Sequence, residues 1–131
     1  MSMFGALDAA SSGVTLGRTW IDASSDNVAN INTVRPAGEE PFRARLVVAR
    51  ARTAQDGVDV ERITEKAGPP EVVYDPENPL ADQEGYVTRP KVDLTEEMTN
   101  IMMASRLYQA NLSVMQQARD SYQQALRIGQ A

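Results

Sequence analysis

The sequence predicts an α+β fold in which long N- and C-terminal helices pair as a coiled coil, with a small β-rich module inserted between them. All seven prolines lie between residues 36 and 90, so long helices are expected only before and after that stretch. Both outer segments carry apolar residues at alternating spacings of three and four, as do helices that pair along a narrow seam. Short runs rich in β-branched residues fill the middle. The predicted parts are residues 1–34, 35–92 and 93–131.

The N-terminal segment is predicted to be a helix that needs a packing partner. Glycines at three positions of its first half each cost about 1 kcal/mol relative to alanine in a helix interior. The segment should therefore be a poor helix alone, and we expect it to become ordered only on packing or assembly. The large apolar members of its seam are Phe4, Leu7, Val14, Ile21 and Val28.

The middle is predicted to consist of short strands. Residues 42–50, 58–63 and 71–74 have the composition of strands, and Gln55-Asp56-Gly57 is expected to turn the chain between the first two. A turn-rich stretch follows at 75–79. A module of about 55 residues is marginal, because on its own it buries only about 60% of the surface of its unfolded chain. We therefore expect it to lean on the helices or on neighbouring subunits.

The C-terminal segment is predicted to be a long helix with one apolar seam. Asp93 is expected to cap it, with Glu96 three residues later as in a capping box. The seam continues for more than four heptads, which is long enough to favour a coiled coil. Its large apolar members are Leu94, Met98, Ile101, Tyr108, Leu112, Met115, Tyr122 and Leu126.

Composition argues against most catalytic chemistry. The chain has no cysteine and no histidine, which removes thiolate nucleophiles, most zinc sites and the usual near-neutral general base. A net charge of −5 would repel a polyanion such as nucleic acid. We expect a protein that is not an enzyme and has no metal, cofactor, small-molecule substrate or nucleic-acid partner.

Two acidic clusters have simpler structural interpretations than catalysis or metal binding. Glu96 and Glu97 are neighbours on the predicted helix, so their side chains diverge by about 100° and cannot share one substrate. Acids are in any case favoured near a helix N-terminus. The acidic stretch 75–84 misses the spacing of a calcium-binding loop and contains two prolines, so a solvated loop is expected there.

The cationic residues likewise suggest no nucleotide or phosphate site. The two lysines, Lys66 and Lys91, lie outside any glycine-rich phosphate loop. The one arginine cluster changes parity along its strand, so a continuous phosphate-binding stripe would need a bulge, and pairing with acidic neighbours is the expected role. The cluster comprises Arg43, Arg45, Arg50 and Arg52.

The sequence shows neither a membrane-spanning segment nor a secretory signal. No apolar run approaches the roughly 20 residues of a membrane-spanning helix, and the first residues lack the basic start and apolar stretch of a secretory signal. We expect a soluble chain that would reach any site outside the cytoplasm without a cleaved signal peptide.

Two short motifs resemble those of the flagellar basal-body rod protein family. The stretch 27–33 resembles the family's N-terminal S-N-x-A-N-x-x-T signature, with Asp26 where serine is usual. Residues 93–98 and 105–111 resemble its C-terminal signature. The motifs lie at opposite ends of the chain, as the family shows, and short matches in the middle extend the resemblance over nearly all of it.

The resemblance implies a structural subunit of the proximal rod, exported by the flagellar type III apparatus and located in the periplasmic span of the basal body. Its implied partners are copies of itself, other rod proteins of the FlgB, FlgF and FlgG type, the basal-body ring and the export apparatus. The seam residues named above would then form an assembly interface. The alternative is a soluble β-adaptor whose dimeric coiled coil binds a protein partner.

Asparagines beside the seams are further candidates for that interface. One interpretation is that Asn27 and Asn30 end the first helix and that Asn111 faces solvent. The other is that their amides bond to backbone or to a neighbouring helix and fix a register that apolar stripes alone would leave free to slide. The resemblance favours the second interpretation, because these asparagines are among the matching positions.

Overall fold

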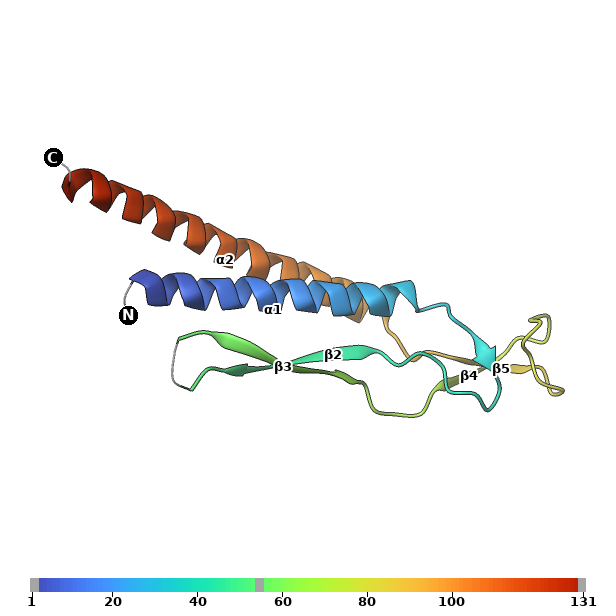
Figure 1. Cartoon of the computed structure of the whole chain (residues 1–131). Helices are drawn as coiled ribbons and strands as arrows, with labels where there is room; N and C mark the ends of the chain where they lie inside the picture. The colour runs from blue at the N-terminus through green and yellow to red at the C-terminus, as the bar shows by residue number, and fades with distance from the viewer. Residues whose placement is uncertain (1–2, 54–55, 130–131) are drawn as a thin grey trace.

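The computed structural model describes residues 3–53 and 56–129 and confirms the predicted fold class: two long helices pack together, with a small antiparallel β module between them in the chain (Figure 1). Both helices are continuous over most of the segments predicted from the sequence. The elements, in chain order, are α1 (Met3–Ala29), β1 (Arg35–Pro36), β2 (Arg45–Ala51), β3 (Val58–Glu65), β4 (Glu71–Tyr74), β5 (Tyr86–Arg89) and α2 (Leu94–Gly129).

Helix α1 lies between α2 and the β2–β3 hairpin, and the second sheet lies beyond the end of α1 where the chain leaves the helix (Figure 1). The hairpin is antiparallel, with Val47 opposite Ile63 and a bulge between Val48 and Ala49. The second sheet has the order β1-β5-β4, also antiparallel. The middle of the chain therefore forms two small sheets, of which the β2–β3 hairpin packs against α1.

The start of α2 follows the capping chemistry predicted for Asp93. The Asp93 Oδ1 atom accepts hydrogen bonds from the backbone N–H groups of Thr95 and Glu96, at 2.7 and 3.0 Å. These bonds satisfy donors that the first helical turn would otherwise leave unpaired. The Glu96 carboxylate is turned toward Lys66 Nζ, 3.1 Å away in the segment after β3.

The hairpin is anchored to α1 near its tip. The predicted turn begins outside the described residues, but Gly57 at its end has a φ of +122°, a conformation that favours glycine. A Cβ atom there would also lie 2.6 Å from Ser12 Oγ. That hydroxyl accepts a hydrogen bond from the Val58 N–H at 3.0 Å and donates one to the Ala9 carbonyl at 2.7 Å.

Strands β1 and β5 were not expected from the sequence. Pro36 removes a backbone donor, and β1 is tolerated because it is only two residues long and lies at the sheet edge. Strand β5 is four residues long but central, and its Val87 is 1% exposed. The Tyr74 and Tyr86 rings meet edge to face across β4 and β5, with centroids 5.3 Å apart.

The buried apolar core is made mostly of small side chains. Among the described residues it comprises Ala10, Ala23, Ala44, Val87 and Ala104. Alanines allow helices and strands to approach closely but bury little apolar area each. Most large apolar side chains consequently lie outside this core.

Candidate assembly interface

Helices α1 and α2 pack most closely through small residues, and only part of the predicted seam of large residues lies on the contact side. A Cβ atom at Gly13 would lie 2.6 Å from the side chain of Asn111. A Cβ atom at Gly17 would lie 3.1 Å from the backbone N of Tyr108 and 3.2 Å from the carbonyl O of Ala104. The glycines that weaken an isolated helix are therefore what allows the two backbones to come together.

The contact uses positions one residue before the predicted seam on both helices. On α1, the small or polar residues Ala10, Gly13, Gly17, Ser24 and Asn27 are buried and share one face by helical spacing. On α2, Glu97 and Ala104 are buried. Ile101, Tyr108 and Met115 belong to the predicted seam and also lie on the contact side, half-buried.

The remaining predicted seam residues lie at the edges of this contact or outside it. On α1, a half-buried group comprises Leu7, Val14, Ile21 and Val28. An exposed group comprises Phe4, Leu94, Met98, Leu112, Tyr122 and Leu126. Phe4 and Tyr122 meet edge to face, with ring centroids 6.1 Å apart, near the N-terminal end of α1.

A three-way junction joins α1, β2 and α2 at Asn27, Arg45 and Glu97. The Asn27 side chain is fully buried. Its Nδ2 donates to the Arg45 carbonyl at 3.0 Å and to Glu97 Oε1 at 3.1 Å, and its Oδ1 accepts from the Arg45 N–H at 2.7 Å. One amide thereby satisfies buried polar groups from two other elements.

Other residues of the N-terminal motif form hydrogen bonds at the end of α1. Asn30 Nδ2 donates to the Asp26 carbonyl at 2.9 Å, and Thr33 Oγ1 donates to the Asn30 carbonyl at 2.7 Å. Asp26 Oδ2 accepts from Arg45 Nη1 at 2.6 Å, a contact with β2. On α2, Asn111 Nδ2 donates to the Leu107 carbonyl of its own helix at 2.9 Å.

Three of the four clustered arginines pair with acids. The bulge in the hairpin, between Val48 and Ala49, separates the first two arginines of the cluster from the last two. Arg43 pairs with Glu40, and Arg45 with Asp26. Arg52 contacts Asp59 and Asp8, each at 2.8 Å, and so connects β3 with α1. The hydrogen bond that Arg52 Nε donates to Asp59 Oδ1 is the main cause that raises the pKa of Arg52 above its usual value.

The acidic stretch 75–84 is organised by its own turns. Asp82 Oδ1 accepts from the backbone N–H groups of Glu84 and Tyr86, and Asn78 Oδ1 accepts from that of Leu80. These are Asx-type turn bonds. Within residues 3–53 and 56–129, no three His, Cys, Asp or Glu side chains gather closely enough to hold a metal ion.

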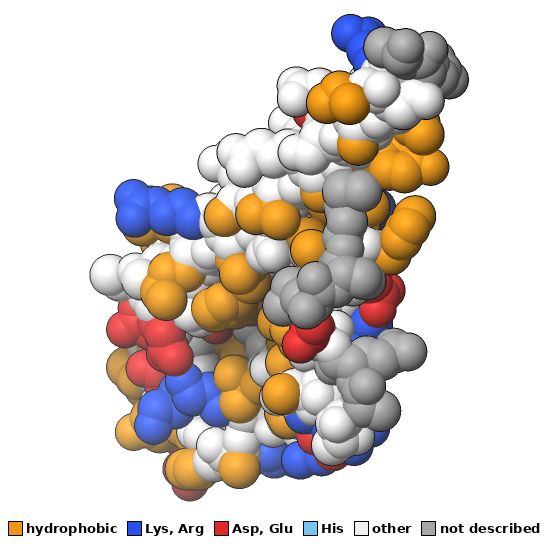
Figure 2. Space-filling model, turned by 90° about the vertical axis from the view of Figure 1, so that its left-hand side faces the viewer, with side chains coloured by type: hydrophobic (Ala, Val, Ile, Leu, Met, Phe, Trp, Pro, Cys, Tyr) orange, Lys and Arg blue, Asp and Glu red, His pale blue; other side chains and the backbone are white. Residues whose placement is uncertain are grey.

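Helix α2 carries large exposed apolar side chains on both sides of its contact with α1. By helical spacing, Met98, Met102 and Leu112 lie on one side, and Met103 and Val114 on the other. We call these five residues the apolar flanks. Figure 2, which views the end with both termini, also shows hydrophobic side chains over the visible surface. Neither helix, where described, is long and apolar enough to span a membrane.

Paired terminal helices that leave large apolar side chains exposed are typical of the class of proteins that pack against other chains. Comparison with known proteins agrees with this class. A sequence model of the flagellar basal body rod FlgEFG protein C-terminal family matches residues 83–128, which include all of the C-terminal motif and the apolar flanks.

Full-length relatives extend the match to almost the whole chain. The flagellar basal-body rod protein FlgC of Escherichia coli O157:H7 is 37% identical over 134 residues, covering 99% of this chain and 100% of the relative. FlgC of Bacillus subtilis is 33% identical over 149 residues, covering 98% and 99%. FlgC of Borreliella burgdorferi is 32% identical over 149 residues, covering 98% of each.

The chain therefore belongs to the flagellar basal-body rod protein FlgC family. It is a structural component of the bacterial flagellar basal-body rod and takes part in motility. The two motifs that carry the resemblance also meet in space, since Asn27 of the first bonds to Glu97 of the second. The alternative of a β-adaptor finds no support in these relatives.

Proposed function

We propose that the chain assembles with copies of itself and with other rod proteins, of the FlgB, FlgF and FlgG type, into the helical tube of the proximal rod and transmits torque through it. Neighbouring subunits would cover the apolar flanks of α2. Contacts between unlike surfaces, related by a rotation that does not close, generate a helical filament. Torque would then pass through many packed helices without any chemical turnover.

One observation carries this proposal: the residues of α2 that are fully buried against α1 are small or polar, whereas the large apolar residues of its flanks are exposed. Met102 and Met103 are each 55% exposed, while Ala104 beside them is fully buried. A monomer would gain stability by burying the methionines and not the alanine. Contiguous exposed apolar side chains usually mark a surface that another protein covers.

The place of the chain in the cell is part of the same proposal. We infer that it lies in the periplasmic span of the basal body, near the ring and the export apparatus, and that it is exported without a cleaved signal peptide. The glycine-rich α1 supports an export-competent state, because this helix needs α2 and the hairpin as partners before it is stable.

The test is a charge placed on one apolar flank. In cells that depend on this chain for motility, we expect Leu112→Asp to be made and exported but absent from purified basal bodies, leaving the cells non-motile, because a charge cannot be buried unpaired between subunits. Ile63→Asp is the matched control, since Ile63 is also an exposed apolar residue but lies on β3. Rods of normal content and full motility with Leu112→Asp would refute the proposal.

The asparagines remain proposed register residues of the assembly. Asn30, just after α1, donates to the Asp26 carbonyl of that helix, and Asn111 donates to the Leu107 carbonyl of α2 and fills the space opposite Gly13. We expect Asn30→Leu and Asn111→Leu to leave the subunit folded and exported while the rods become short, irregular or absent. Rods of normal length in both variants would leave these residues with a local role only.

A further inference from the structure

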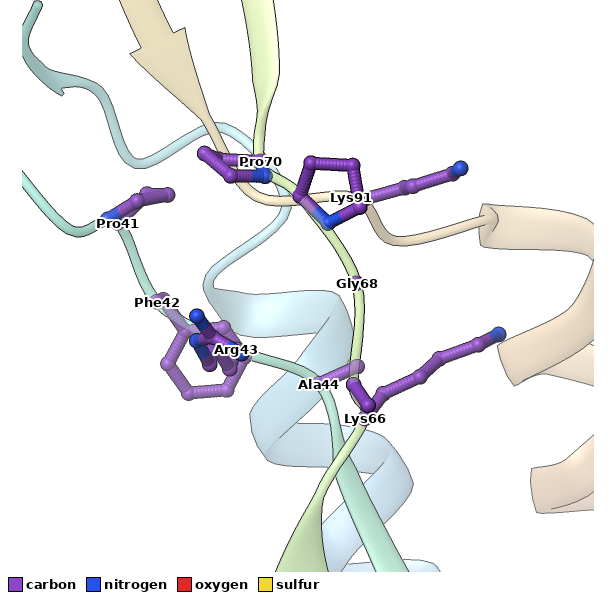
Figure 3. A pocket seen from close by; sticks show the side chains of 10 residues that line it. Pro41, Phe42, Arg43, Ala44, Lys66, Gly68, Pro70 and Lys91 are labelled. Carbon is purple, nitrogen blue, oxygen red and sulfur yellow. The ribbon is translucent and has the colours of Figure 1, made fainter.

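The small cavity beside Phe42 lacks the properties of a ligand site. It measures about 100 Å³, whereas sites for small molecules usually measure about 300–1,000 Å³. Arg43 and Lys66, which line it, are each paired with an acidic neighbour. Figure 3 shows the side chains of Lys66 and Lys91 extending away from the cavity. The cavity therefore offers a partner neither room nor free charge.

The second sheet, in contrast, leaves one of its two faces exposed. Val73 and Val87 lie opposite each other on one face, and Val87 is 1% exposed. Tyr74 and Tyr86 lie opposite each other on the other face, which also carries Val72. Tyr74 is 63% exposed and Val72 is 61% exposed. We call Val72, Tyr74 and Tyr86 the tyrosine face. An apolar sheet face of this kind is normally covered by another element.

The two tyrosines of this face are held in place by the loop beside them. Their rings meet edge to face, and the Tyr74 ring lies over Gly85, where a Cβ atom would be 2.8 Å from Tyr74 Cε2. The Tyr86 N–H donates to Asp82 Oδ1 at 2.8 Å, and the Asp75 N–H donates to the Gly85 carbonyl at 2.9 Å. Binding a partner would therefore cost little ordering, and rigid tyrosines are frequent anchors of interfaces.

Negative charge borders the tyrosine face. The loop of residues 75–84, which joins its two strands, carries four carboxylates and neither lysine nor arginine. In the part of the chain that the structure describes, none of the four forms an ion pair. Glu77 and Glu84 are exposed. A partner that fits this surface presents apolar side chains together with a cation.

The flank of α2 that contains Met98 and Met102 has this composition. Met98, Met102 and Arg106 follow one another at intervals of four, so they form one ridge along the helix, and all three are exposed. Arg106 is the only charged residue between positions 98 and 118. Among the described residues it has no ion-pair partner. Methionine sulfur and the guanidinium group both pack favourably against aromatic rings.

We propose that the tyrosine face of one copy of this chain packs against this ridge of a second copy. The two methionines of the ridge cover Val72 and the tyrosine rings, and the guanidinium of Arg106 faces the carboxylate of Glu84. This inference rests on the proposed self-assembly and specifies what covers one flank of α2.

The geometry of the chain places this contact between copies. Neither helix, where described, packs against β4 or β5, and α2 leads away from the second sheet of its own chain (Figure 1). Because the tyrosine face and the ridge are different surfaces, the contact is head to tail, and each chain can engage two neighbours through it.

Thiol crosslinking tests the contact directly, because the chain has no cysteine of its own. Gln83→Cys marks the loop beside the tyrosine face and Gln109→Cys marks the ridge; both residues are exposed and uncharged. In basal bodies that contain both single variants, a short bis-maleimide should yield a mixed dimer. A chain that carries both substitutions should yield a ladder of oligomers.

Two further cysteine positions complete this experiment. Replacing Gln109→Cys by Ala49→Cys, an exposed uncharged position on β2, should yield neither product. Ser113→Cys, exposed about one turn further along α2, is the second ridge position if Gln109→Cys does not enter the basal body.

Charge exchange then tests the recognition. In the chain with the ridge cysteine, Arg106→Glu should lower the yield of mixed dimer, relative to the amount of chain recovered, by about fivefold, as for a well-placed exposed ion pair. Glu84→Arg in the chain with the loop cysteine should restore most of it. Met102→Gln should also lower the yield, because it removes apolar burial. Arg127→Glu, which reverses an exposed arginine in the last turn of α2, should leave the yield unchanged.

The possible outcomes separate this inference from the proposed function. If the cysteine variants are recovered in basal bodies but loop and ridge do not crosslink, or if Gln83→Cys crosslinks only to a different rod protein, a second copy does not occupy the tyrosine face. Self-assembly through other surfaces then stands. If Glu84→Arg fails to restore the yield, the charge pairing is wrong. If the wild-type chain is absent from basal bodies, the proposed function itself fails.

Discussion

The contact of α2 with α1 and the apolar flanks of α2 lie on the same helix but differ in composition. The contact brings two backbones close together through glycines, alanines and the polar three-way junction, beside the half-buried Ile101, Tyr108 and Met115. The flanks contain methionine, leucine and valine, left exposed. The difference indicates that close packing and hydrogen bonds hold the two helices together, and it supports the proposal that neighbouring subunits cover the apolar flanks.

The largest loss of stability is expected from Asn27→Leu. The substitution removes the partner of the buried Glu97 carboxylate and of the part-buried backbone N–H and C=O of Arg45. We expect the free energy of unfolding to fall by about 3–5 kcal/mol, measured by urea denaturation followed by circular dichroism.

Asn30→Leu is the matched control for the junction. The Asn30 side chain donates only to the Asp26 carbonyl, in an exposed bond at the end of α1, so its replacement should cost less than about 1 kcal/mol. If both variants lose the same free energy of unfolding, the buried bonds of Asn27 contribute no more to stability than the exposed bond of Asn30. That result would contradict the account of the junction given above.

A smaller loss is expected from widening the contact at Gly17. The nearest atoms to a Cβ there include the backbone of Tyr108 and Ala104, which cannot rotate away as a flexible side chain could. We expect Gly17→Val to lower the free energy of unfolding by about 1–3 kcal/mol. Ser11→Val, exposed on the same helix, should change it by less than about 0.5 kcal/mol. An unchanged free energy of unfolding in Gly17→Val would show that α1 and α2 are not closely packed at this glycine.

A substitution on the flanks should affect assembly and leave the subunit stable. Met102 is 55% exposed, so Met102→Asp should change the free energy of unfolding by less than about 0.5 kcal/mol. We expect the same variant to be missing from purified basal bodies. A strongly destabilised Met102→Asp monomer would mean that this flank belongs to the core of the subunit.

The smallest effect concerns Arg52, which joins β3 to α1 through exposed ion pairs. Its pKa is raised in the folded chain, so the stabilisation is fully present below the usual arginine pKa and is lost only as the pH rises through the raised value. The stability difference between wild type and Arg52→Gln should thus stay constant between about pH 6 and pH 9. It should shrink as salt is added. If the stability difference changes sharply across this pH range, the ion pairs of Arg52 are not its cause.

The sequence predicts the elements of this fold better than the contacts between them. Asp93 marks the start of α2, and the strands at 58–63 and 71–74 are found almost where expected, because caps and β-branched runs are local signals. The burial of Asn27 is not local. Its partners Arg45 and Glu97 are 18 and 70 residues away, and only the tertiary fold brings them together.

The register of the helix contact shows why the candidate site was harder to predict. Assigning the seam to large apolar residues selects Met98 and Leu112, whereas the chain buries Glu97 and packs Asn111 against Gly13. A signal was present in the small residues Ala10, Gly13 and Gly17, whose spacing of three and four is typical of closely packed helices. Helix propensity alone predicts only that those glycines weaken the helix.

Methionine oxidation distinguishes the contact from the flanks in a single measurement. Met98, Met102 and Met103 are 52–55% exposed in the subunit, whereas Met115 is half-buried on the contact side. Peroxide treatment followed by mass spectrometry should oxidise the first three rapidly in the purified chain and slowly in isolated basal bodies, with Met115 slow in both. Equally fast oxidation of Met98, Met102 and Met103 in basal bodies would contradict the claim that neighbouring subunits cover the apolar flanks.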